Sequence, residues 1–142
     1  MNDTVELLRE CDSGTKMAVT SIDDILEKVK DKSLKNTLAD SKTEHSVIGS
    51  KIHSMLLDLG GDDKAPNPIA AGISSAMVDI KTAVGDKDAT IADIITDGCN
   101  MGVKSLNRYL NKYKAADDEA KNVCRELSDM EETLAHDMRR YL

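Results

Sequence analysis

The chain has 142 residues, enough for one ordinary domain and too few for two independent hydrophobic cores. Its formal net charge is −7, so its surface should repel phosphate backbones and anionic lipids, and we expect neither nucleic acid nor a membrane as partner. Aromatic residues are nearly absent, with three Tyr and neither Phe nor Trp. The core must therefore be aliphatic, which suits helix packing better than a β-sheet.

The sequence predicts a soluble, cytoplasmic protein. No apolar run approaches the ~20 residues of a membrane span. The first residues, Met1 to Thr4, lack the basic start and apolar stretch of a signal peptide. The three Cys are an odd number without scaffold-like spacing, which is typical of reduced intracellular thiols.

Two long helices are predicted in the first half of the chain, and together they form one hairpin over residues 3–60. Asn2 or Asp3 caps the first helix. Its inward-facing residues recur in alternating steps of four and three: Thr4, Leu8, Cys11, Thr15, Ala18, Ile22, Ile25 and Val29. The polar link at Lys30–Ser33 is so short that the second helix must return antiparallel. That helix carries Leu34, Leu38, Ser41, His45, Ile48, Ile52, Met55 and Leu59, and it ends at Gly60-Gly61.

The second half repeats this plan after a crossover at residues 61–86, in which we expect a short helix over about 68–84. The inward-facing residues of a helix form its seam. Neither half of the chain could bury its apolar seams alone, so the crossover is not a domain boundary and residues 1–142 form one domain. The second hairpin spans 88–142. Its third long helix is expected to bury Ala92, Thr96, Cys99, Val103, Leu106, Leu110 and Tyr113, and its fourth Ala120, Cys124, Leu127, Glu131, Leu134, Met138 and Tyr141.

A short sequence motif occurs in both halves of the chain. Cys11-Asp12-Ser13-Gly14-Thr15-Lys16 returns 88 positions later as Cys99-Asn100-Met101-Gly102-Val103-Lys104. Shifted by 86 positions, the seam of the second helix also overlays that of the fourth, so that His45 corresponds to Glu131. These matches favour an internal duplication, although all bundle helices share the heptad-like period. Glycine within these helices, at Gly98 and Gly102, indicates that another group approaches closely there.

Over nearly its full length, the chain resembles the small bacterial ferritin-like proteins whose biochemical role is unassigned. The resemblance lies in Gly14, the Lys30–Lys35 turn, the Leu59-Gly60-Gly61 ending and the extra helix in the crossover. It implies an all-α, ferritin-like antiparallel four-helix bundle made of two helical hairpins.

The resemblance also allows a test for iron ligands. Active members of the ferritin-like class hold two irons with a Glu on each first helix and a Glu-x-x-His on each second helix. In this chain the residues three before the histidines are Lys42, Ser50 and Thr133, so no Glu-x-x-His exists. The first-helix positions are held by Cys11 and Cys99, whereas iron–oxygen chemistry needs several hard carboxylates. A working di-iron centre is therefore not expected, and we predict no cofactor.

Five residues remain candidates for a degenerate Zn or Fe site: Cys11, Cys99, His45, Glu131 and Glu44. Zn²⁺ accepts thiolate, imidazole and carboxylate ligands. The simpler interpretation of His45 and Glu131 is a buried hydrogen bond that fixes the packing register. The simpler interpretation of the cysteines is that they pack as small hydrophobes. If Cys11 and Cys99 lie at the same level along the bundle axis, they could instead form a reversible disulfide.

Three hypotheses for function follow. The favoured one is a non-catalytic ferritin-like protein that acts through its surface as a structural or stress-related interaction module. The alternatives are a metal-binding protein with a degenerate mid-bundle site and a thiol-based redox-responsive protein. Long helical faces also leave a homodimer or a protein partner open.

Overall fold

All regular secondary structure in the described part of the chain is helical. This computed structural model describes residues 2–61 and 85–142. Its helices are α1 (Asp3–Leu26), α2 (Lys32–Asp58), α4 (Lys87–Lys112) and α5 (Asp118–Met138), followed by the short 3-10 helix η1 (Arg139–Tyr141). No strand occurs within these two ranges. The short helix predicted for residues 68–84 lies outside the described residues.

Side-chain caps mark the helix starts, and the predicted cap at Asn2 is confirmed. Asn2 accepts a hydrogen bond from the Thr4 amide at 2.9 Å, and Asp117 accepts one from the Ala120 amide at 2.8 Å. The predicted ending of α2 is also confirmed, because Gly60 has a φ of +71° that residues with a Cβ rarely adopt. These local signals explain why the chain breaks into helices at these points.

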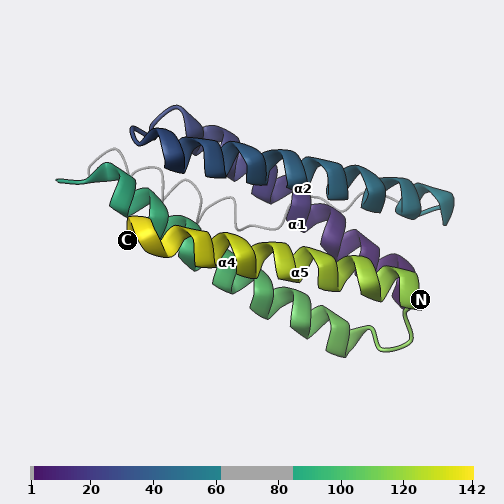
Figure 1. Cartoon of the computed structure of the whole chain (residues 1–142). Coiled ribbons are helices and arrows are strands. Elements are labelled where there is room, and N and C mark those ends of the chain that lie inside the picture. Colours follow the sequence, from purple (N-terminus) through teal and green to yellow (C-terminus); the bar gives the residue numbers. More distant parts are fainter. Residues whose placement is uncertain (1, 62–84) are drawn as a thin grey trace.

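The four long helices pack as a bundle. Figure 1 shows α1 beside α2 and α4 beside α5, with the two pairs laid against each other. The start of α1 contacts the turn before α5: the Asp117 amide donates to Thr4 Oγ1 at 2.8 Å, and the Ala115 amide donates to Asp3 Oδ2 at 3.0 Å. The start of α4 makes a matching contact with the turn before α2.

In that second contact, Asp88 is the acceptor. Its two carboxylate oxygens receive the Lys30 and Asp31 amides at 2.9 and 2.8 Å. The beginning of each pair's first helix therefore caps the connecting turn of the other pair. These reciprocal contacts tie both ends of the bundle together.

The core consists of two apolar clusters. One combines the first part of α1 and the second part of α2 with the end of α4 and the start of α5: Leu7, Leu8, Cys11, Ile48, Ile52, Leu56, Leu106, Ala116, Ala120, Val123, Cys124 and Leu127. The other combines the opposite ends of the same helices: Ile22, Ile25, Val29, Leu34, Leu38, Ile91, Ala92, Ile95, Cys99, Leu134 and Met138. The sequence positions between the two clusters are polar on α1, α2 and α5.

We call these intervening residues the polar belt: Asp12, Ser13, Thr15, Ser41, His45, Ser128 and Glu131. The first six are buried, and the Glu131 side chain is 12% exposed. Buried polar groups cost free energy unless they are hydrogen-bonded, so the belt restricts how the helices can align.

Most predicted seam residues are buried, with some differences in detail. Leu59 was expected in the core but is 48% exposed, and Leu56 is fully buried in its place. This follows because α2 gives way to the glycine turn, which directs Leu59 away from the bundle. The first helix ends at Leu26, short of Val29, yet Val29 still reaches the core from the turn.

The glycines divide into crowded and open positions. A Cβ on Gly102 would lie 3.3 Å from Glu131 Oε2, which confirms the predicted close approach, whereas nothing lies within 4 Å of a Cβ on Gly98. The prediction for Gly98 is wrong because this residue lies on the exposed side of α4. A crowded glycine that the sequence analysis did not single out is Gly49, whose Cβ would lie 3.0 Å from Thr15 Oγ1.

The Asp88 cap can be tested by substitution. Asp88→Ala removes the acceptor for two backbone amides, and we expect it to lower the free energy of unfolding by about 1–2 kcal/mol. Asp93→Ala, at an exposed position on the same helix, is the matched control. Urea denaturation measures both, and equal effects of the two variants would contradict the role given to Asp88.

Substitution by alanine should change stability in opposite directions at an open and at a crowded glycine. Gly98→Ala should stabilise the protein by about 0.5–1 kcal/mol, because helix propensity improves without a steric conflict. Gly49→Ala should destabilise it by about 1–2 kcal/mol, because Thr15 is buried and β-branched and cannot move aside easily. The same urea measurement applies, and a stabilising Gly49→Ala would show that α1 and α2 are less tightly packed at this point.

Candidate functional site

The candidate site is the middle of the polar belt, where α2, α4 and α5 meet. His45 Nε2 lies 2.5 Å from Glu131 Oε1, which joins α2 to α5. The His45 side chain is 1% exposed and that of Glu131 12%. The predicted buried hydrogen bond between these two residues is therefore confirmed.

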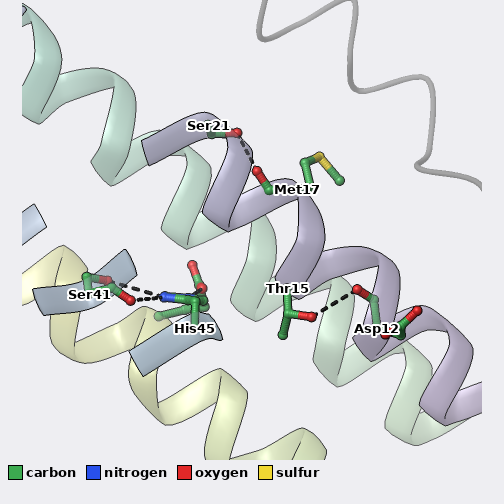
Figure 2. Close-up of polar contacts among 7 residues, drawn as sticks. Asp12, Thr15, Met17, Ser21, Ser41 and His45 are labelled. Atoms are coloured by element: carbon green, nitrogen blue, oxygen red, sulfur yellow. Dashed lines mark hydrogen bonds and ion pairs between the residues drawn. The ribbon is translucent and has the colours of Figure 1, made fainter. Parts of the chain in front are cut away.

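The other side of the His45 ring is held by its own helix. Nδ1 lies 2.8 Å from the Ser41 carbonyl oxygen and 3.3 Å from Ser41 Oγ, as Figure 2 shows. A carbonyl oxygen can only accept, so Nδ1 carries a hydrogen. A second hydrogen lies between Nε2 and the Glu131 carboxylate. The pair thus holds one more proton than a neutral imidazole beside an ionised carboxylate.

The surroundings of His45 determine which form of the ring is stable. Burial opposes the charge and lowers the pKa of His45, but the hydrogen bond and negative charge of Glu131 raise it, as do the Ser41 carbonyl and the charge of Glu44. The net effect raises the pKa above its ordinary value of 6.5. We therefore describe the contact as a buried imidazolium–carboxylate ion pair.

Cys99 completes this arrangement from α4. Its thiol hydrogen-bonds to Glu131, and Gly102 on the same helix leaves room for the carboxylate. Burial raises the pKa of the Cys99 thiol, and the charge of Glu131 and the hydrogen bond raise it further. Cys99 is consequently a protonated thiol near neutral pH, whereas metal binding and nucleophilic attack both require the thiolate.

Two buried carboxylates on α1 were not singled out from the sequence. Asp12 is 1% exposed, and its carboxylate lies 2.9 Å from Lys16 Nζ and 3.4 Å from His53 Nδ1. The helical spacing of Asp12 and Lys16, four residues apart, is the signal that could have indicated this pair. Figure 2 also shows the Asp12 carbonyl accepting a hydrogen bond from Thr15 Oγ1 at 2.9 Å.

Glu10 is the second of these carboxylates. It is 8% exposed and accepts a hydrogen bond from Tyr109 on α4. Burial, followed by the charge of Glu10 and this hydrogen bond, raises the pKa of Tyr109 to about 12. Both buried acids on α1 therefore have partners on a second helix.

The five predicted metal ligands are only partly brought together. His45, Glu131 and Cys99 meet in the belt. Glu44 is exposed and lines a groove of about 200 Å³ between α2 and α5, beside Ser41. Among the described residues, no three or more His, Cys, Asp or Glu side chains converge in a way that could hold a metal ion.

Cys11 and Cys99 lie on opposite sides of the belt. Cys11 belongs to the cluster around the start of α1, and Cys99 to the cluster around the start of α4. Cys11 precedes the belt residues of α1, whereas Cys99 lies on α4, which runs in the opposite direction along the bundle (Figure 1). The two cysteines of the repeated motif therefore lie apart, and the neighbour of Cys11 is Cys124.

A family model places the chain among known sequences. The model described as a domain of unknown function, DUF2383, matches residues 3–112. The chain belongs to this DUF2383 family. The match covers α1, α2 and all of α4, and it stops before α5, which carries Glu131. Comparisons with curated proteins and with solved structures gave no match. None of the described helices combines the length and apolar character needed to cross a membrane.

The ion pair predicts a specific dependence of stability on pH. Because the pKa of His45 is raised in the folded protein, its stabilising contribution is fully present below the unfolded value of about 6.5 and is lost as pH rises through the folded-state pKa. Stability should therefore decrease as pH increases above about 6.5. Urea denaturation across this range measures the change.

His45→Gln should remove this pH-dependent component and cost about 3 kcal/mol near pH 6, because Glu131 loses its charged partner. His136→Gln, at an exposed position on α5, is the control and should keep the pH dependence of the unsubstituted protein. If His45→Gln and His136→Gln had the same stability–pH profile, His45 would not carry the extra proton.

Proposed function

We propose that this DUF2383 protein is a non-catalytic, ferritin-like antiparallel bundle that serves as a structural or stress-related interaction module in a bacterial cytoplasm. The observation that supports this proposal is that the Glu131 carboxylate already has bonding partners. The carboxylate best placed for chemistry in the interior is already bonded to His45 and Cys99. The buried polar groups thus act on one another and fix the bundle, which leaves its surface for contact with other molecules.

The di-iron group of the ferritin-like class does not fit these residues. It requires several hard carboxylates around the metal pair, and of the belt's two carboxylates only Glu131 lies next to the protonated thiol of Cys99. Asp12, the belt's other carboxylate, pairs with Lys16 and His53. We therefore derive no redox or oxygen chemistry for this interior.

Surface features are consistent with an interaction role. Large apolar side chains are exposed on the described surface, among them Val47 and Leu57 on α2, which are 67% and 56% exposed. The formal net charge of −7 favours protein partners over nucleic acid or anionic lipid. A homodimer and a different protein partner both fit this description.

A second candidate function is metal binding at His45, Glu131 and Cys99 after a rearrangement of their side chains, which as they stand do not converge on a metal position. The proximity of an imidazole, a carboxylate and a thiol favours it, because Zn²⁺ takes all three types of ligand. For such a site to form, the His45 ring and the Cys99 thiol would both have to release a proton. The first proposal therefore predicts weak metal binding that competes with protons.

Elemental analysis of the untagged full chain distinguishes the two proposals. For an interaction module we expect less than about 0.1 equivalent of transition metal per chain, unchanged by Glu131→Gln. Bound metal close to one Zn²⁺ or two Fe per chain that disappears in Glu131→Gln would favour the metal site. Glu126→Gln, at an exposed position of α5, is the matched control.

A further inference from the structure

The alignment of α1 with α5 brings two cysteines together. The Asp117 amide bonds to Thr4 Oγ1, a contact between residues 113 positions apart. Cys11 and Cys124 have the same separation and lie two helical turns further along their helices. Both helices start at the same end of the bundle (Figure 1), so this register carries through from the first contact to the second. The Thr4 contact thus places the two cysteines at the same level along the bundle.

Cys11 and Cys124 are neighbours within one buried core cluster. The thiols share a hydrogen bond, and both residues are 0% exposed within the same core cluster. Cys124 also donates to the Leu106 carbonyl oxygen over 3.8 Å, which fixes its side-chain direction. All three cysteines of the chain are free thiols in this structure.

Helix geometry allows these two residues to be linked. Helices that pack with ~8–10 Å between their axes, each with Cα atoms at a radius of ~2.3 Å, place facing Cα atoms roughly 3.4–5.4 Å apart. A disulfide needs Cα atoms about 4.4–6.8 Å apart. The bond can therefore form without moving either helix far.

We propose that Cys11 and Cys124 form a reversible disulfide that locks α1 to α5 when the protein meets a hydroperoxide. In the first step the Cys124 thiolate attacks the terminal peroxide oxygen, which gives a sulfenic acid and releases the alcohol, or water from hydrogen peroxide. In the second step the Cys11 sulfur attacks the sulfenic sulfur, the S–S bond forms and water leaves. Two thiols are oxidised and one peroxide bond is reduced.

The environment assigns different roles to the two sulfurs. The hydrogen bond from Cys11 lowers the pKa of the Cys124 thiol against the opposing effect of burial, and the charge of Arg125 lowers it further. The same hydrogen bond and burial raise the pKa of Cys11. Cys124 is therefore the sulfur that reacts first and Cys11 the one that resolves the intermediate.

The burial of Cys11 and Cys124 determines how fast their thiols are oxidised. Because neither thiol reaches solvent, the oxidant gains access only when the contact between α1 and α5 opens locally. Oxidation should consequently be slow in buffer and faster in urea at concentrations below the unfolding transition. The disulfide goes beyond the proposed interaction role, since it requires neither a partner nor a metal.

The test uses the full chain, treated with hydrogen peroxide in buffer and in urea below the unfolding transition. We expect the free thiols to fall from three to one per chain, with a mass loss of two hydrogens and a proteolytic fragment pair that links Cys11 to Cys124. The midpoint of thermal unfolding should rise and return to its original value after reduction. Cys99→Ser is the control and should form the same link.

Three outcomes would overturn the proposal. They are a link that involves Cys99, oxidation to sulfinic acid without any link, and no loss of thiols at any urea concentration below the transition. Cys124→Ala should abolish the link. If this variant does not fold, the fragment map of Cys99→Ser alone still decides the question, because that protein can form only the Cys11–Cys124 bond.

Discussion

The His45–Glu131 ion pair is the contact on which the arrangement of the helices depends. It lies between two apolar clusters that, by themselves, would tolerate several alignments of the four helices, since Leu, Ile and Val can replace one another in such packing. A slip of one helical turn would separate the imidazole from the carboxylate and bury each without its partner. The cost of an unpaired buried charge is several kcal/mol, comparable to the total stability of a small domain. The ion pair thus selects one alignment.

The reciprocal caps fix the ends of the bundle in the same way that the belt fixes its middle. Asp88 holds the turn between α1 and α2, and Asp3 with Thr4 holds the turn between α4 and α5. This two-fold pattern agrees with the repeated motif in the sequence. At the centre of the pattern the two equivalent positions carry complementary groups, a histidine on α2 and a glutamate on α5.

The sequence predicted the helices and their ends because these follow from local chemistry, such as the cap at Asn2 and the glycine at Gly60. It also predicted that His45 meets Glu131, because the seams of the two helices overlay position for position. It did not predict that Cys11 meets Cys124, because the repeat suggests a partner in the other copy and carries no information about the end from which each helix enters the belt. The burial of Asp12 was missed for a similar reason. An aspartate next to a seam residue is normally solvated, whereas this one is buried with His53 of α2 beside its carboxylate.

The protonation state of His45 tests this account most directly. Nitrogen NMR of protein labelled with ¹⁵N-histidine, recorded as a function of pH, reports whether each ring nitrogen carries a hydrogen. We expect both nitrogens of His45 to be protonated at pH 6 and to lose the extra hydrogen only above the ordinary pKa of 6.5. Glu131→Gln should restore a neutral ring with the hydrogen on Nδ1. A neutral His45 ring at pH 6 in the unsubstituted protein would show that the interior is aligned without a buried ion pair, and it would contradict the account.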